Sequence, residues 1–318
     1  MRNMMEEPVN KSERAKRSLL RTVRRQRLKY ITVLPSLVTL INGVCGFASI
    51  VFASHAGQGD IAGGLDAYHE HFPFFSMASY MIFFAMLADM LDGHLARISQ
   101  STSSFGGQLD SLCDVISFGV APAFLMLRVV ECGVTFNNEA LDVFVYRFLW
   151  LAAAIYIGCA AIRLARFNVE NEEDEANHMS FWGLPSPAAA GVITSLIILN
   201  QDIVKKIDGT QPFFSYMGHN IIIAALPFVT LAVAVLMVSR IRYPHILNQY
   251  LHGRKPFAYL IRAIAFLVII IISREVALVL VFCGFAISGF TKWFYYRVIA
   301  HKQTPGEAEE PPVLTISH

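Results

Sequence analysis

The chain has 318 residues, of which 55% are hydrophobic and only 16% are charged, with a formal net charge of +2. Soluble domains are about 45–50% apolar and about 25% charged, so this composition excludes an ordinary soluble domain. Several segments contain the roughly 17–25 apolar residues that a helix needs to cross a bilayer. The five cysteines are scattered without a CxxC pair, which argues against a zinc site or a disulfide framework. The sequence therefore predicts an all-α, polytopic integral membrane protein, built as a helical bundle.

The first segment, residues 1–33, is rich in Lys and Arg and precedes an apolar run at 34–53. A basic segment of this kind keeps the N-terminus in the cytoplasm and can lie on anionic lipid. It lacks interleaved aromatic residues, so we expect no nucleic-acid partner. The apolar run exceeds the usual 7–15 residues of a signal-peptide core and predicts the first transmembrane helix.

Further along the chain, apolar runs predict about eight transmembrane helices in all. After the first, they lie at 74–88, 107–130 and 144–166, in a fifth run ending near 200, and at 220–239, 257–273 and 275–295. The intervening segment 54–72 is expected to be a loop in which His69 and His71 are solvated, and Pro73 suits the first turn of the second helix. We expect a basic segment at 1–33, a transmembrane domain at 34–297 with its catalytic core at 34–244, and a disordered tail at 298–318.

The distribution of basic residues predicts the orientation of these helices. With both termini in the cytoplasm, all but five of the 26 Lys and Arg residues fall on the cytoplasmic side. The exceptions are Arg128, Arg147, Lys205, Lys206 and Arg274. This asymmetry follows the positive-inside rule.

The stretch from Asp89 to Asp114 is polar although it lies between two apolar helices. Asp89 and Asp92 are three residues apart and share a helix face, while Asp110 and Asp114 share a face of the next helix. Carboxylates brought this close near a bilayer need divalent cations in order to stay ionised. The spacing predicts a two-metal site for a phosphate-bearing substrate at the cytoplasmic face.

The full pattern, D-x2-D-G-x2-A-R-x8-G-x3-D-x3-D, resembles the signature of the CDP-alcohol phosphotransferase family. Its fixed positions are Asp89, Asp92, Gly93, Ala96, Arg97, Gly106, Asp110 and Asp114. The resemblance implies that the four aspartates bind two ions and that Asp114 also acts as general base on the acceptor hydroxyl. It further implies that the CDP portion of the donor binds at Gly93, Ala96, Arg97 and Gly106.

The residue types suit this chemistry. Displacement of a nucleotide from a pyrophosphate develops charge on the attacking and leaving oxygens, which two metal ions neutralise. Hard oxygen ligands favour Mg²⁺ or Mn²⁺. Glycines let a substrate approach the helix backbone, and the guanidinium of Arg97 matches phosphate oxygens.

Three further stretches, at 34–47, 162–191 and 237–244, resemble the phosphatidylserine synthase branch of the family. That resemblance implies transfer of the phosphatidyl group from CDP-diacylglycerol to L-serine with release of CMP. It also implies a homodimer. We expect a cytoplasmic membrane of bacterial type, and the distribution of basic residues predicts that the active site faces the cytoplasm.

Candidate acceptor-binding residues lie at the cytoplasmic end of the fourth helix. Arg163 and Arg166 could hold the carboxylate of an amino acid there, or could serve only as positive-inside anchors. Asn168 could assist them or simply end the helix. On the first helix, Thr39 and Asn42 could line the cleft or form ordinary hydrogen bonds between helices.

The sequence leaves other functions open. Within the family, the acceptor could be an inositol-type alcohol or a glycerol phosphate. A cation-coupled transporter would also use intramembrane carboxylates, but the motif lies toward one face and paired broken helices are not evident. A non-catalytic membrane anchor is the third alternative.

Overall fold

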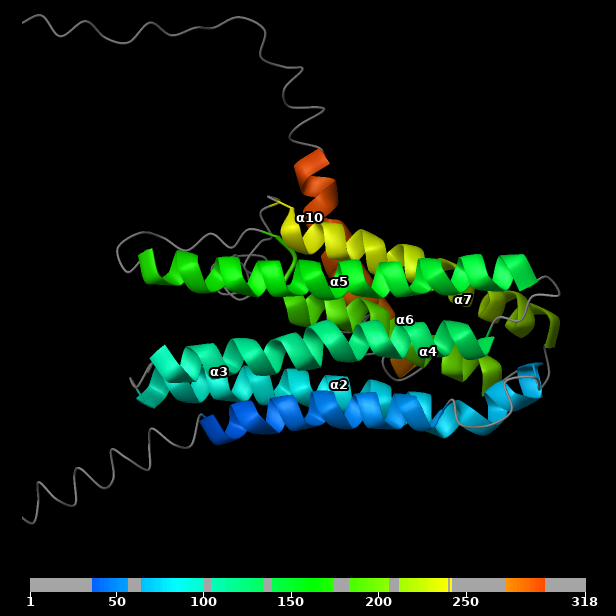
Figure 1. Cartoon of the computed structure of the whole chain (residues 1–318), viewed down its shortest axis with the longest axis horizontal. Coiled ribbons are helices and arrows are strands. Elements are labelled where there is room, and N and C mark those ends of the chain that lie inside the picture. Colours follow the sequence, from blue (N-terminus) through cyan, green and yellow to red (C-terminus); the bar gives the residue numbers. More distant parts are fainter. Residues whose placement is uncertain are drawn as a thin grey trace, which may run out of the picture.

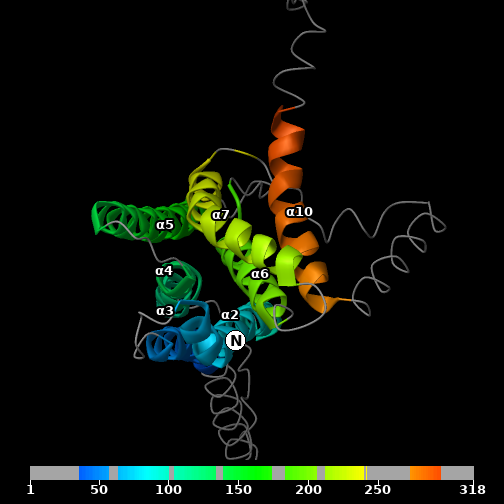
Figure 2. The same cartoon turned by 90° about the vertical axis from the view of Figure 1, so that its right-hand side faces the viewer.

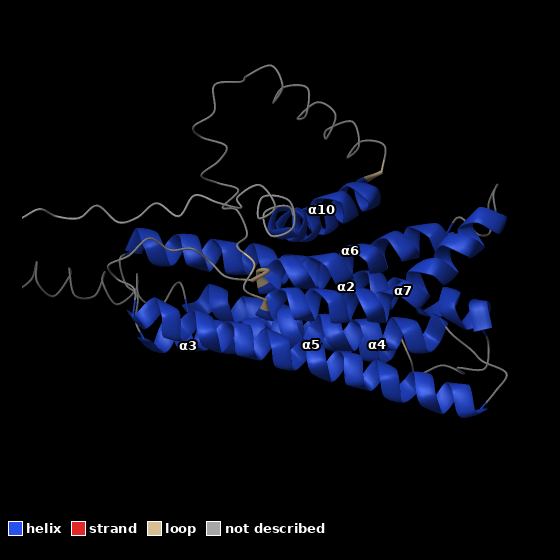
Figure 3. Ribbon diagram, turned by 90° about the horizontal axis from the view of Figure 1, so that it is seen from above, coloured by secondary structure: helices blue, strands red, loops and turns tan. Residues whose placement is uncertain are grey.

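The computed structural model describes residues 36–56, 64–99, 104–133, 139–173, 183–205, 212–239, 241 and 273–294. Within these ranges every regular element is a helix, as Figure 3 shows, so the predicted all-α class is confirmed. The elements are an N-terminal helix Ser36–His55, α2 Gly64–Ser99, α3 Ser104–Asp114, the π-helix η2 Val115–Val120, α4 Ala121–Gly133, α5 Glu139–Glu173, α6 Ser186–Lys205, α7 Pro212–Val238 and α10 Arg274–Phe294.

In the described part of the chain, seven helical segments are long and apolar enough to cross a bilayer. Large hydrophobic side chains cover the outward faces of the bundle, among them Phe84, Phe144, Ile221 and Phe228. Such extensive exposed apolar surface is typical of contact with lipid. The protein is therefore a multi-pass membrane protein. The helix expected at 257–273, the basic segment 1–33 and the tail 298–318 lie outside the described residues.

The core of the bundle surrounds α4. Figure 2, seen along the bundle, places α4 between α2 and α5, and α4 also contacts α6 and α7. The largest fully buried side chains include Phe75, Phe118, Leu125, Tyr156 and Ile193, which come from five different segments. Burial of this apolar surface between helices fixes the relative positions of the helices. It therefore also fixes the positions of the polar residues on α2 and α3.

The helix α10 crosses the bundle instead of running along it, as Figures 1 and 2 both show. It packs on α6, where a Cβ at Gly191 would collide with the ring of Phe282. The same ring lies 5.6 Å, centroid to centroid, from that of Phe83 on α2. The glycine thus permits a close crossing in which one aromatic side chain contacts two helices.

The predicted loop 54–72 is wrong over its second half, because α2 already begins at Gly64. Pro73 therefore lies inside the helix and not in its first turn. The residues between them include no further proline or glycine that would stop a helix, and membrane helices tolerate an internal proline. His69 and His71 therefore lie on the N-terminal part of α2 and not in a loop.

Other boundaries also differ from those expected. The third membrane segment begins at Ser104 and includes η2, an irregularity that apolar periodicity does not reveal. Helix α5 starts at Glu139 and continues to Glu173, well beyond the expected 144–166; its acidic first turn suits the positive end of the helix dipole. Helix α7 begins at Pro212 and not near 220, with proline at a position where its missing N–H costs nothing.

Candidate active site

The aspartate motif lies at one end of the bundle, where α2 ends and α3 begins (Figure 1). Helix α2 carries Asp89 and Asp92, and α3 carries Asp110 and Asp114. Carboxylate oxygens of Asp89, Asp92 and Asp110 lie within 4.8 Å of one another. The side chain of Asp92 is only 4% exposed and that of Asp114 only 7%. The two helices thus hold three carboxylates as one cluster with a fourth beside it.

These carboxylates fit a divalent metal. Buried oxygens of Asp92 (Oδ2) and Asp110 (Oδ1) have no hydrogen-bond partner among the described residues. A buried carboxylate oxygen without a partner is costly, and a metal ion removes that cost. Of the described basic side chains near the cluster, Arg163 is close enough to interact with Asp89 and Asp114. One guanidinium does not balance four carboxylates, and a set of oxygen ligands suits Mg²⁺ or Mn²⁺.

The N-terminal helix reaches both halves of the acidic site. Asn42 is fully buried and donates from Nδ2 to Oδ1 of Asp114 at 2.9 Å. The side chain of Thr39 forms a hydrogen bond with the carboxylate of Asp92. Both residues, predicted to line the cleft or to bond neighbouring helices, lie against the aspartates. A contact with substrate remains a prediction for each.

The residues expected to bind the CDP portion lie around the same end. A side chain at Gly93 would have no described atom within 4 Å of its Cβ, so the helix backbone there faces open space. Gly106 is in the first turn of α3 and is partly buried. Ala96 and Arg97 are in the last turn of α2, where the description covers the backbone alone.

The three candidate acceptor residues on α5 have different surroundings. Arg163 donates from a terminal guanidinium nitrogen to Oγ of Ser186 at 2.8 Å, while its buried Nε has no partner among the described residues. Arg166 donates to the carbonyl of Val238 at 3.3 Å. Asn168 exchanges hydrogen bonds of 2.8 and 3.1 Å with Ser111 on α3. Arg166 and Asn168 therefore connect helices, whereas Arg163 also faces the aspartates.

Sequence reasoning did not single out Ser111, Ser117, Tyr156 or Ser186 as part of this region. Their partners are on other helices, so no spacing within one helix identifies them. For Ser186 alone the sequence offers a partial signal, because a proline on either side of it marks the start of α6.

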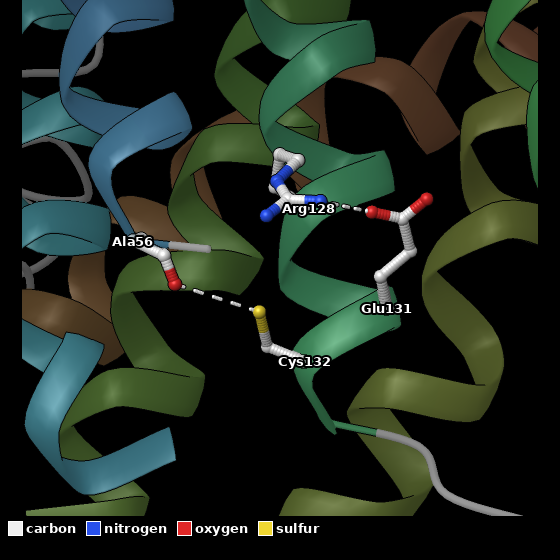
Figure 4. A network of polar contacts seen from close by, with 4 residues as sticks. All are labelled: Ala56, Arg128, Glu131 and Cys132. Atoms are coloured by element: carbon white, nitrogen blue, oxygen red, sulfur yellow. Dashed lines mark hydrogen bonds and ion pairs between the residues drawn. The ribbon is translucent and has the colours of Figure 1, made fainter. Parts of the chain in front are cut away.

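A second group of polar residues lies on α4, far from the aspartates. Figure 4 shows Arg128 paired with Glu131, and Cys132 beside the carbonyl of Ala56. The ion pair is 2.5 Å long, and the Cys132 thiol donates to the Ala56 carbonyl at 3.6 Å. Arg128 is 14 residues beyond Asp114, about 21 Å at the helical rise. The two charges neutralise each other inside an apolar segment, as intramembrane charges usually must.

Comparisons with known proteins agree with the geometry. A family profile described as CDP-alcohol phosphatidyltransferase matches residues 32–237. A CDP-diacylglycerol–serine O-phosphatidyltransferase of Helicobacter pylori is 32% identical over 225 residues, covering 70% of this chain and 82% of that protein. A protein of the same name from Methanocaldococcus jannaschii is 32% identical over 169 residues, 53% of this chain and 64% of that one.

An archaetidylserine synthase of Methanothermobacter thermautotrophicus is 30% identical over 224 residues, covering 70% of this chain and 73% of that protein. The matched region includes the N-terminal helix, the whole aspartate motif and most of α7. The resemblance inferred from the motif is thereby confirmed. The chain belongs to the CDP-alcohol phosphatidyltransferase family of membrane enzymes.

Proposed function

We propose that this enzyme is a phosphatidylserine synthase, which transfers the phosphatidyl group of CDP-diacylglycerol to the hydroxyl of L-serine and releases CMP. The observation that carries the transfer chemistry is the carboxylate cluster of Asp89, Asp92 and Asp110 with Asp114 beside it. Serine as the acceptor is supported by relatives that carry that name and by a half-buried arginine next to the cluster.

Asp89, Asp92 and Asp110 would hold the divalent ions, two by analogy with the family, and Asp114 would complete the ligand set. When bound, such ions neutralise the charge that develops on the oxygens around the transferred phosphorus. The open space over Gly93 offers the nucleotide a close approach to the backbone of α2. Ala96, Arg97 and Gly106 are proposed to bind the rest of the CDP portion, with the guanidinium of Arg97 on phosphate oxygens.

Asp114 is proposed as the general base. Its Oδ1 accepts a hydrogen bond from Asn42, and we propose that Oδ2 takes the proton of the serine hydroxyl. Each carboxylate oxygen has a second lone pair, with which Asp114 would also face a metal ion. The serine oxygen then forms a bond to the phosphorus, and the bond from that phosphorus to the CMP oxygen breaks. The proton remains on Asp114 until the products leave.

Arg163 is proposed to bind the serine carboxylate. Its Nε is buried without a described partner, and the bond to Ser186 fixes the orientation of the guanidinium. A planar guanidinium binds a carboxylate through two parallel hydrogen bonds. Because Arg163 also lies close to Asp114, a serine held there by its carboxylate would bring its hydroxyl toward the base.

We also propose that the active site faces the cytoplasm. The lipid donor is within the bilayer and serine is soluble, so the reaction requires a site at the membrane surface. The aspartates are on the last third of α2 and on α3, helices that meet at one end of the bundle, and the distribution of basic residues supports a cytoplasmic location for that end. We also propose that the enzyme works as a homodimer in a bacterial-type cytoplasmic membrane.

An acceptor screen tests this function. The purified full chain in detergent micelles is supplied with CDP-diacylglycerol and Mn²⁺, and CMP release is measured with L-serine, inositol, inositol phosphate or glycerol 3-phosphate. We expect release with serine alone. Release with another acceptor and not with serine would contradict the serine assignment, and no release with any of them would favour a transporter or an anchor. Asp114→Asn provides the blank for non-enzymatic breakdown of the donor.

A further inference from the structure

The helix that carries Asp114 changes its winding immediately after that residue. Helix α3 ends at Asp114 and the π-helix η2 begins at Val115. Within η2 the N–H groups bond five residues back, as the N–H of Ala121 does with the carbonyl of Ile116. One residue of an α-helix corresponds to about 100° of rotation, so a π turn rotates the preceding segment against the following one. The turn thus sets the direction of Asp114 relative to the buried face of α4.

Tyr156 supplies a hydrogen bond from another helix to a carbonyl of this turn. In an α-helical register the carbonyl of Phe118 would accept from the N–H of residue 122, which is proline and has none. The hydroxyl of Tyr156 on α5 donates to that carbonyl at 2.9 Å instead. Tyr156 and Phe118 are both fully buried, so water does not replace the bond. The hydroxyl therefore pairs a buried carbonyl of η2 and links this turn to α5.

The same turn holds the N-terminal helix against Asp114. Ser117, inside η2, donates from its hydroxyl to the main-chain carbonyl of Asn42 at 2.8 Å. A Cβ at Gly46 would collide with Ser117, so the two helices approach as closely as a glycine allows. Asn42 in turn donates from its side chain to Asp114. A rotation of the turn would displace Ser117. Because Ser117 is bonded to Asn42, the rotation would also move Asn42, whose side chain orients the carboxylate of Asp114.

We propose that Tyr156 is a positioning residue, which holds the π turn through the Phe118 carbonyl and so sets the direction in which Asp114 meets the acceptor hydroxyl. The proposal rests on the proposed role of Asp114 as base. Tyr156 lies seven residues, or about 10 Å, before Arg163 on the same face of α5, and it is deeper in the bundle. It acts on the reaction through the backbone of η2 and not by contact with substrate.

Tyr156→Phe removes the hydroxyl group and keeps the aromatic ring. We expect kcat to fall by about 10–100-fold, because small displacements of a catalytic group cost that much, while KM for CDP-diacylglycerol and for the acceptor stays within about twofold. Thr230→Val is the matched control, since Thr230 is also fully buried and its hydroxyl donates to a carbonyl, that of Leu226 in its own helix. We expect the control to keep the wild-type kcat.

A double variant separates positioning from stability. Pro122→Ala in the Tyr156→Phe background supplies a local N–H four residues beyond the Phe118 carbonyl, but it does not restore the hydrogen bond between η2 and α5. We expect the thermal unfolding temperature of the double variant to return toward that of the wild type, while kcat stays low. Recovery of kcat together with stability would overturn the proposal, as would an unchanged kcat in Tyr156→Phe alone.

A parallel pair of variants covers the case in which Tyr156→Phe does not fold. Ser117→Ala removes the hydrogen bond to the first helix. Ser195→Ala removes an equally buried serine hydroxyl whose bond, among the described residues, is to Val192 in its own helix. We expect a loss of kcat for Ser117→Ala alone; equal rates in the two variants would overturn the proposal. All rates are measured with whichever acceptor the wild type uses, so failure of serine as acceptor contradicts the proposed function and leaves this test intact.

Discussion

Asn42 donates a hydrogen bond from Nδ2 to Oδ1 of Asp114 at 2.9 Å, across 72 residues of sequence. Both side chains are buried, at 0% and 7% exposure. An ionised carboxylate accepts hydrogen bonds and donates none, so this contact occupies one oxygen of Asp114 and leaves the other available for a proton. The N-terminal helix therefore takes part in the site, although the aspartate motif itself lies wholly on α2 and α3.

Asn42→Ala tests the importance of that contact. A hydrogen bond to a charged group contributes about 1.5–3 kcal/mol, so we expect kcat to fall by roughly 10–100-fold. Steady-state CMP release at saturating donor and acceptor measures the change. A variant that keeps the wild-type kcat would show that Asp114 does not depend on Asn42 for its orientation.

Removal of single carboxylates tests the metal site. Asp89→Asn, Asp92→Asn and Asp110→Asn should each weaken Mn²⁺ binding to the protein without substrates, because each loses a charged oxygen ligand from a set within 4.8 Å. Titration calorimetry measures the affinity directly. Asp142→Asn, an exposed acid in the first turn of α5, is the control and should bind as the wild type does. Equal affinities in all four variants would argue that the cluster is not a metal site.

The role of Arg163 predicts a change in KM. In Arg163→Lys a compact ammonium replaces the planar fork, so the bidentate contact with a carboxylate is lost. We expect KM for serine to rise by roughly tenfold or more, with KM for CDP-diacylglycerol little changed. Arg147→Lys, on the same helix but exposed, is the matched control. If KM for serine is the same in both variants, Arg163 does not bind the acceptor.

The close contact of the first helix with η2 predicts opposite effects for two glycine substitutions. Gly46→Ala places a methyl group against Ser117 and should lower stability by about 1–3 kcal/mol through overpacking. At Gly158 on α5 no described atom lies within 4 Å of an added Cβ, so Gly158→Ala should be neutral or stabilise by about 0.5–1 kcal/mol. Thermal unfolding in detergent measures both. Equal destabilisation would contradict the packing described for Gly46.

Much of the site could be predicted because its acidic residues follow a regular spacing within each helix. Aspartates three or four residues apart share a helix face whatever the tertiary fold, so Asp89 with Asp92 and Asp110 with Asp114 could be paired from the sequence. The fold class followed in the same way from the length of the apolar runs. Family membership required only the motif.

Contacts between distant helices could not be predicted. The bond between Ser111 and Asn168 depends on how α3 and α5 pack, and no periodicity encodes it. The bond from the Tyr156 hydroxyl to the π turn joins residues 38 positions apart, and no spacing within one helix predicts it. The early start of α2 is not predictable from Pro73, because a proline suits the first turn of a helix but also occurs inside membrane helices, as it does here.

The transfer of the serine oxygen to phosphorus is the central claim, and an isotope experiment tests it most directly. The wild-type enzyme in detergent is supplied with CDP-diacylglycerol, Mn²⁺ and L-serine labelled with ¹⁸O in its hydroxyl group, and the products are weighed by mass spectrometry. We predict phosphatidylserine that retains the label, with unlabelled CMP. Failure to form phosphatidylserine, or a product without the label, would contradict it.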